Sequence, residues 1–155
     1  MILLKAATAA ELCRHAQEAY PLECCGVVLN GPQGEQVRRC SNIQDRLHRE
    51  DPEKYPRDAR IAYYMDPEEL YRIFKETDQS GTLIKAFYHS HPDHEAYFSA
   101  EDKERGTAWG EPLHPDTTYI VVSLFSGTVK GMKAFAWDSD KKDFTEILLE
   151  TDSSE

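Results

Sequence analysis

The feature of this sequence that most constrains its fold is an apolar run, Leu83 to Tyr88, that leads directly into His89-Ser90-His91-Pro92. Its length and composition predict a buried β-strand. Side chains two residues apart on a strand project to the same side, so His89 and His91 are expected next to each other at the end of the strand. The fold must therefore be built around a strand with two imidazoles on one face.

Helix signals lie on both sides of this strand. Thr8 is followed three residues later by Glu11, which is the spacing of a capping box. Asp66 precedes Pro67 at a first helical position, and Ser99 opens a third segment with capping chemistry. The predicted helices therefore cover residues 8–19, 67–78 and about 99–108.

The remaining β-prone runs are short. Val27–Leu29 and Gln36–Cys40 flank turn residues and predict a hairpin. Further strands are predicted over residues 61–64, 118–125, 131–137 and 144–149. The resulting order of helices and strands predicts an α/β fold in which helices sandwich the mixed β-sheet of a single domain.

Two charged segments are predicted to lie outside this framework. Residues 44–58 are mostly charged, with Leu47 and Tyr55 as the apolar exceptions, and predict an exposed loop. Residues 150–155 predict a frayed, disordered acidic tail. The expected domain therefore covers residues 1–149, and the loop is a candidate contact surface for a partner.

Charge and cysteine content exclude several classes of function. The 155 residues include 18 Lys and Arg against 28 Asp and Glu, a formal net charge of −10, which argues against a nucleic-acid partner. Lys5 interrupts the apolar start, so neither a signal peptide nor a membrane span is predicted. A cytoplasmic protein is therefore expected, and its four cysteines are predicted to be reduced and mostly buried: Cys13, Cys24, Cys25 and Cys40.

The histidine pair predicts a metal site. A third ligand has to come from another element, and Asp102 lies in the first turn of the predicted helix that follows the strand. Two imidazoles and one carboxylate suit Zn²⁺, and three protein ligands leave the fourth tetrahedral position for a water molecule. Such an open site is typical of catalysis, and it still requires a general base and a group that stabilises an oxyanion.

These residues resemble the motif of the JAMM (MPN+) metalloprotease family, in its small, stand-alone prokaryotic form. The compact part of the motif is His89, His91, Pro92, Ser99 and Asp102 at their exact spacings. The resemblance extends to the upstream segment that carries the family's catalytic Glu, Tyr20-Pro21-Leu22-Glu23-Cys24-Cys25-Gly26, and to Asn42. The family implies a cytidine-deaminase-like fold.

The resemblance also implies a role for each residue. His89, His91 and Asp102 would bind one Zn²⁺, with a water molecule as the fourth ligand. Glu23 would act as general base, and Ser99 would donate a hydrogen bond to the oxyanion. The reaction would be hydrolysis of a peptide or isopeptide bond at the C-terminal Gly-Gly tail of a ubiquitin-like or sulfur-carrier protein. Such a tail is expected to bind in an extended form, paired with a free strand edge beside the metal.

Simpler interpretations stand beside these roles. Ser99 and Asp102 can be an ordinary capping pair, and both roles can hold at once. Glu23 is marked only by the resemblance and by the need for a base. His94 and His114 are expected at the surface. For His94, the alternative is contact with the substrate or with the rim of the metal site.

Two other functions compete with the peptidase. Relatives of this fold without the metal motif serve as scaffold or interaction domains, against which the intact ligand set argues. A zinc deaminase would need His-x-Glu followed by Pro-Cys-x-x-Cys. The His-x-Glu sequence here, His48-Arg49-Glu50, lies in the charged segment, and the cysteine motif is absent from the sequence.

Overall fold

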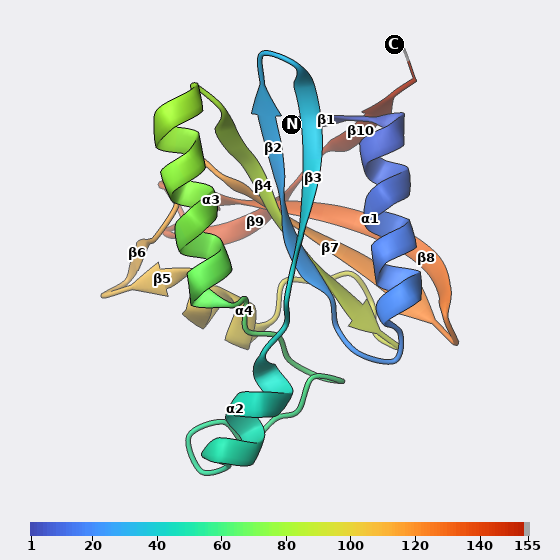
Figure 1. The fold of residues 1–155 in the computed structure, drawn as a ribbon, viewed down its shortest axis with the longest axis vertical. Helices are drawn as coiled ribbons and strands as arrows, with labels where there is room; N and C mark the ends of the chain where they lie inside the picture. Colours follow the sequence, from blue (N-terminus) through green and yellow to red (C-terminus); the bar gives the residue numbers. More distant parts are fainter. Residues whose placement is uncertain (154–155) are drawn as a thin grey trace.

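The computed structural model describes residues 1–153 and contains a central mixed β-sheet with helices on both faces (Figure 1). In spatial order the sheet consists of β3 (Gly34–Cys40), β2 (Cys25–Gly31), β4 (Leu83–Pro92), β7 (Thr118–Phe125), β8 (Thr128–Asp138) and β9 (Asp143–Ile147). β4 and β7 run parallel, and the other neighbouring strands run antiparallel. The predicted fold class and the β2–β3 hairpin are confirmed.

Two long helices cover opposite faces of the sheet (Figure 1). Helix α1 (Ala6–Ala19) buries Leu12 and Ala16 in one apolar cluster, and α3 (Pro67–Ser80) buries Ile73 in the other. Neighbouring residues of β2 divide between these clusters, because successive side chains on a strand point to opposite faces. The strand that carries the two histidines lies between both layers.

The ends of these helices match the sequence signals to different degrees. At α3, the Asp66 side chain accepts a hydrogen bond from the N–H of Glu68, and Gly81 ends the helix with φ of 72°. Helix α1 begins at Ala6 without a side-chain cap, so the predicted cap at Thr8 is wrong. The chain passes straight from a preceding strand into the helix, and Thr8 is buried in its first turn.

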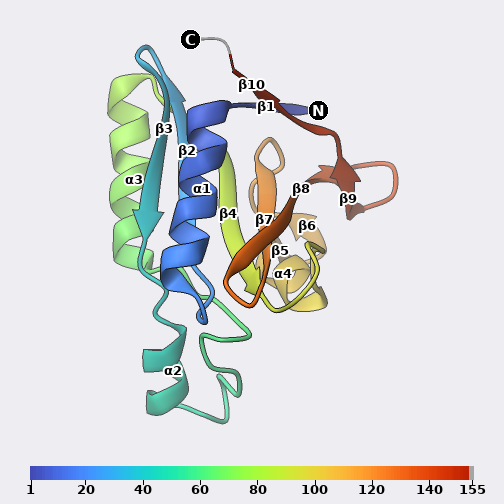
Figure 2. The same cartoon turned by 90° about the vertical axis from the view of Figure 1, so that its right-hand side faces the viewer.

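The charged segment 44–58 is not entirely a loop. Residues Gln44–Glu50 form helix α2, which projects from the body of the fold (Figures 1 and 2). Gln44 is buried there, and its amide donates a 2.9 Å hydrogen bond to the carbonyl of Arg57. The sequence did not reveal this helix because a polar side chain, rather than an apolar stripe, anchors it.

The strand predicted over residues 61–64 is also absent from the described structure. This stretch is extended, but its ladder is limited to one isolated bridge between Asn42 and Met65. Tyr64 turns both main-chain groups toward the end of β3: its N–H donates to Asn42 Oδ1 at 3.0 Å, and its carbonyl accepts from Ile43 at 2.9 Å. The segment therefore lies beside the sheet without joining it.

The disorder predicted for the acidic tail is wrong for residues 150–152. Strand β10 (Leu149–Asp152) runs parallel to β1 (Ile2–Lys5), and the two lie side by side in Figure 2. Leu4 is fully buried, and Lys5 forms a 3.1 Å ion pair with Asp152. The terminal strand therefore gains its order from a partner at the other end of the chain; residues 154–155 of the predicted tail lie outside the described residues.

The predicted third helix is shorter than expected. Helix α4 (Ala100–Arg105) ends before Gly106 and is followed by a two-stranded hairpin, β5 (Thr107–Ala108) and β6 (Glu111–Pro112). A Cβ atom on Gly106 would lie 3.0 Å from the ring of Phe144, so glycine permits the close approach of this turn to β9. No helix within residues 1–153 is long and apolar enough to span a bilayer.

Candidate active site

The two histidines lie near the end of β4, His89 at the last pair with β2 and His91 beyond it, opposite Ser123 of β7. His89 is opposite Cys25 of β2 and Val121 of β7, and both histidine side chains are buried. Their Nε2 atoms are 3.2 Å apart. The predicted placement of both imidazoles on one face is therefore what the structure contains.

Asp102 reaches this pair from the first turn of α4. Its Oδ2 atom lies 3.1 Å from Nε2 of His89 and 3.4 Å from Nε2 of His91. Ser99 forms a complete capping box with it: the N–H of Asp102 donates to Ser99 Oγ, and the N–H of Ser99 donates to Oδ2, both at 3.0 Å. Burial raises the pKa of Asp102, but the imidazoles and the Ser99 N–H lower it by a larger amount. The pKa of Asp102 is therefore well below its usual range.

These three donor atoms fit a tetrahedral metal ion. Their separations of 3.1, 3.2 and 3.4 Å form a nearly equilateral triangle. Ligand bonds of about 2.0 Å in a tetrahedral zinc site put neighbouring donor atoms about 3.3 Å apart. Nδ1 of His91 lies 2.9 Å from the carbonyl of Glu95, which can only accept, so Nδ1 carries a hydrogen and Nε2 is the nitrogen placed to bind a metal.

Glu23 faces the same cluster from the segment between α1 and β2. One of its carboxylate oxygens and one nitrogen of each histidine, His89 and His91, all lie within 4.8 Å of one another. Its side chain is buried, and burial followed by the negative charges of Asp102 and Glu101 raises its pKa well above the usual value. A carboxyl group with a raised pKa beside histidines is suited to accept and return a proton.

Main-chain contacts hold Glu23 in place. Its N–H donates to the carbonyl of Ala59 at 2.7 Å, and its carbonyl accepts from Nδ2 of Asn42 at 2.9 Å. Asn42, marked in the sequence only by family resemblance, also accepts from the N–H of Tyr64 at 3.0 Å. The next residue, Cys24, is tied to β4 because its N–H donates to Ser90 Oγ at 2.8 Å.

Tyr63 is a residue of this site that the sequence did not reveal. Its ring stacks on the imidazole of His89, with centroids 4.4 Å apart and planes inclined by 24°. Its position depends on how residues 59–66 fold beside the sheet. The sequence has no periodic pattern there that predicts this fold. Arg105, at the end of α4, was also missed, because nothing in the sequence shows that its side chain lies over the Tyr63 ring, at 5.8 Å.

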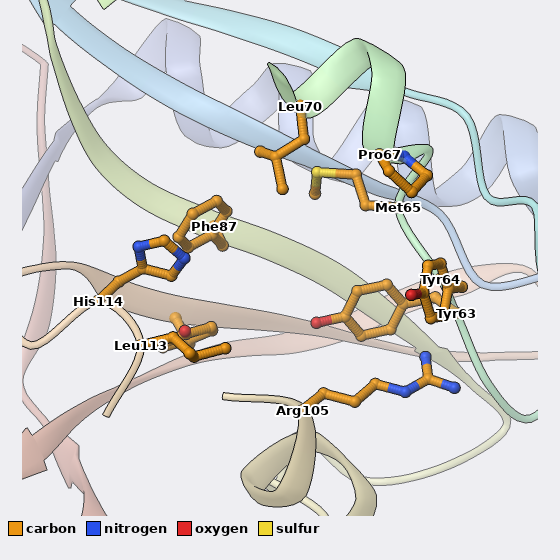
Figure 3. A pocket seen from close by; sticks show the side chains of 10 residues that line it. Tyr63, Tyr64, Met65, Pro67, Leu70, Phe87, Arg105, Leu113 and His114 are labelled. Atoms are coloured by element: carbon orange, nitrogen blue, oxygen red, sulfur yellow. The ribbon is translucent and has the colours of Figure 1, made fainter. Parts of the chain in front are cut away.

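Two cavities meet at Tyr63 and Arg105. The first, of about 220 Å³, holds Glu23, His91, Ser99 and Asp102. The second, of about 410 Å³, is lined mainly by apolar side chains, including Met65, Leu70, Phe87 and Leu113 (Figure 3). A polar cavity beside the donor cluster therefore adjoins an apolar one, and Tyr63 and Arg105 line both.

The two remaining histidines of interest differ in position. His94 is exposed and lines the smaller cavity. His114 lines the apolar cavity, where its ring centroid lies 5.5 Å from that of Phe74 and 4.9 Å from that of Phe87. His114 is therefore half-buried rather than fully at the surface, because the turn after β6 brings its ring against Phe74 of α3. This burial lowers its pKa.

The cysteines do not contribute to the donor cluster. All four are free thiols, and Cys24, Cys25 and Cys40 are buried. Burial raises the pKa of Cys24 to about 11 and that of Cys40 to about 12, so both stay protonated near neutral pH. The prediction of reduced, mostly buried thiols is confirmed.

Comparison with known families gives a match over residues 5–139 to the prokaryotic homologs of the JAB domain. The chain belongs to this family. The resemblance drawn from the motif residues is therefore confirmed. Membership of the family shows the fold and the kind of domain. The distances between the side chains of Glu23, His89, His91 and Asp102 are those of this chain itself.

Curated relatives match most of the chain. It is 28% identical over 131 residues to the desampylase of Haloferax volcanii, which covers 82% of this chain and 81% of that protein. It is also 28% identical over 123 residues to the CysO-cysteine peptidase of Mycobacterium tuberculosis, covering 79% and 73% of the two chains.

Solved structures show the same fold at lower identity. A Desulfitobacterium hafniense protein superposes with a TM-score of 0.72 at 24% identity and covers 99% of this chain and 94% of its own. A JAB1/MPN domain protein from Archaeoglobus fulgidus superposes with a TM-score of 0.54 at 13% identity, covering 98% and 97%.

Proposed function

We propose that the protein is a zinc-dependent peptidase or isopeptidase that cleaves the amide bond at the C-terminal Gly-Gly tail of a ubiquitin-like or sulfur-carrier protein. The observation that carries this proposal is the triangle of donor atoms from His89, His91 and Asp102 with Glu23 opposite it. Two relatives bear the names desampylase and CysO-cysteine peptidase, which supports a hydrolase of this substrate class.

The three donor residues are assigned to one Zn²⁺. When bound, the ion supplies a water molecule acidified to a pKa near 7 and polarises the scissile carbonyl. The remaining carboxylate, Glu23, is assigned as the base. Glu23 is itself close enough to be a ligand, since one of its oxygens lies within 4.8 Å of a nitrogen of each histidine. We assign the third ligand position to Asp102 because its Oδ2 lies 3.1 and 3.4 Å from the two Nε2 atoms.

Proton transfer is assigned to Glu23. The carboxyl group is buried and its pKa is raised, so it holds a proton near neutral pH more readily than an exposed glutamate. It accepts a proton from the attacking water and returns it to the nitrogen of the leaving amine. The hydrogen bonds from Asn42 and to Ala59 fix its main chain for both steps.

Stabilisation of the oxyanion is assigned to Ser99. Its Oγ already accepts a hydrogen bond from the N–H of Asp102, so the hydroxyl hydrogen remains to donate to another atom. The capping box orients this hydroxyl toward the smaller cavity, which both residues line. Structural and catalytic roles of Ser99 therefore do not conflict.

The edge that binds the substrate tail is assigned to residues 63–65. At His89, strand β4 is paired with β2 on one side and with β7 on the other, and at His91 the pairing with β7 alone continues. Tyr64 turns its main-chain groups toward residues 42 and 43, so the alternation of an extended chain directs those of Tyr63 and Met65 to the opposite side. There they are placed to pair with an extended Gly-Gly segment between the two cavities.

We also place the protein in the cytoplasm, since its four free thiols suit a reducing compartment. The test of the function uses sulfur-carrier and ubiquitin-like proteins that carry one extra residue, or a lysine-linked peptide, after Gly-Gly. Zinc-loaded enzyme is expected to release the extension and leave a Gly-Gly end, read by mass spectrometry. Intact substrates together with a chain that retains no zinc would instead favour a scaffold domain.

A further inference from the structure

An exposed tryptophan stands at the tip of the β5–β6 hairpin. Trp109 is fully exposed, has φ of 56°, and is followed by Gly110 with φ of 77°. The pairing of Ala108 with Glu111 makes this a two-residue turn, in which positive φ at both central positions favours Asn, Asp or Gly. A large aromatic ring is therefore held in solvent by a backbone conformation that disfavours it, and neither folding nor the metal site explains it.

The hairpin is firmly attached to the active site. It follows directly on α4, the helix that bears Asp102, and its base is closed by a 2.9 Å hydrogen bond from the N–H of Leu113 to the carbonyl of Gly106. Gly106 is packed against Phe144 of β9. The position of Trp109 relative to the donor residues is therefore set by short, packed connections.

An apolar strip connects the hairpin to the site. Leu113, half exposed at the hairpin base, lines the cavity of about 410 Å³ and faces it beside His114 (Figure 3). Tyr63 closes the opposite part of the same cavity and stacks on His89. The apolar strip therefore runs along the cavity from Leu113, at the base of the hairpin, to Tyr63, whose ring stacks on His89, and Trp109 stands free at the hairpin tip.

The charges around this strip are negative. Arg105, the cation of the hairpin segment, is engaged by Glu101 at 2.9 Å. The carboxylates of this segment are exposed at Glu104, Glu111 and Asp116. A partner on this surface is therefore expected to bring an apolar patch flanked by lysine or arginine side chains.

We propose that the β5–β6 hairpin is a docking arm for the folded body of the substrate protein, with Trp109 as its apolar anchor and Glu111 as its charged contact. The inference rests on the proposed function, and it assigns to the substrate a basic-rimmed apolar patch near its C-terminal tail. The tail itself lies in the cavity beyond Leu113, so the arm contacts parts of the substrate that a short tail peptide lacks.

The test compares a whole substrate with its tail. The probes are a sulfur-carrier protein with one residue added after Gly-Gly and a peptide of its last eight residues with the same addition. Trp109→Ala is expected to raise KM for the protein about tenfold or more, as for an aromatic hot spot, and to leave KM for the peptide unchanged. Glu111→Lys is expected to raise KM for the protein alone, with a smaller effect at high salt.

Leu83→Ala is the matched control, because Leu83 is also an exposed apolar residue but lies at the far end of β4 from the histidines. It is expected to change neither KM. The proposal is overturned if Trp109→Ala leaves KM for the protein within twofold of the wild type, or raises KM for the peptide equally.

A binding measurement separates this inference from the proposed reaction. In a Glu23→Gln background, calorimetry with the same carrier protein is expected to give a Kd that Trp109→Ala weakens about tenfold or more. Trp109-dependent binding without cleavage by the wild type would support the docking arm and refute the reaction. Cleavage by the wild type with binding independent of Trp109 would refute the docking arm alone.

Discussion

The hydroxyl group of Tyr20 donates a 2.8 Å hydrogen bond to Oδ2 of Asp93. Tyr20 ends α1 three residues before Glu23, and Asp93 lies two residues after His91. The same carboxylate accepts a 2.9 Å hydrogen bond from the N–H of Ser126. One contact therefore connects the segment that carries the proposed base to the segment that carries a proposed ligand.

Removal of this hydroxyl group by Tyr20→Phe is expected to lower the free energy of unfolding only slightly, because the hydrogen bond is exposed to solvent. Zinc affinity, measured by competition with a chelator, is expected to fall several-fold because the two segments lose a common anchor. Tyr71→Phe is the control, since Tyr71 is an exposed tyrosine of α3. Equal zinc affinity in wild type and Tyr20→Phe would contradict this role.

Ser99→Ala separates a cap from a catalytic group. Loss of the cap is expected to reduce stability by about 1 kcal/mol. If the hydroxyl donates to the oxyanion, kcat falls in addition by about 10²- to 10³-fold. Zinc content should stay near one ion per chain, because the hydrogen bond from Ser99 to Asp102 Oδ2 comes from the main chain. Thermal unfolding and steady-state kinetics measure both effects, and a tenfold or smaller drop in kcat would leave Ser99 as a cap only.

Stability in acid is expected to depend on His15. Burial, followed by the charge of Arg39, lowers the pKa of His15 to about 4, and Nδ1 lies 2.6 Å from the hydroxyl oxygen of Tyr88. Below its unfolded pKa of about 6.5, the unfolded chain takes up a proton that the folded chain refuses until about pH 4. The free energy of unfolding therefore falls between pH 6.5 and 4, by less than the limit of about 1.4 kcal/mol per pH unit, because His15 is only half-buried and solvent screens its charge.

The variant His15→Gln removes this titration. Urea unfolding of both proteins at several pH values is expected to give a flatter profile for the variant between pH 6.5 and 4. Above pH 7 the difference between the two proteins should no longer change with pH. Parallel profiles over the whole range would show that His15 is protonated equally in both states.

Local signals in the sequence predicted the elements that bury apolar residues. The run from Leu83 to Tyr88 forms β4, and Asp66 and Ser99 cap α3 and α4 as their spacing indicates. Strand alternation was enough to place His89 and His91 together. Asp102 was expected near them because it belongs to the capping box of the helix that follows the strand. A capping box is also a local feature of the sequence.

Elements held by distant polar contacts could not be predicted in this way. Helix α2 depends on a buried Gln44, and β10 depends on β1 at the other end of the chain. The extended segment at residues 61–65 is placed by the side chain of Asn42 rather than by a ladder. Tyr63 came to the site through the last of these segments. Arg105 lies in the predicted helix α4, but no pattern in the sequence marked it as a site residue.

The most direct test of the central claim measures zinc content and cleavage together in Glu23→Gln. The substitution keeps the size of the side chain and leaves the donor triangle of His89, His91 and Asp102 intact. The account predicts about one zinc ion per chain by elemental analysis and no released extension by mass spectrometry, under conditions where the wild type cleaves its substrate completely. Full cleavage by the zinc-loaded variant would contradict it.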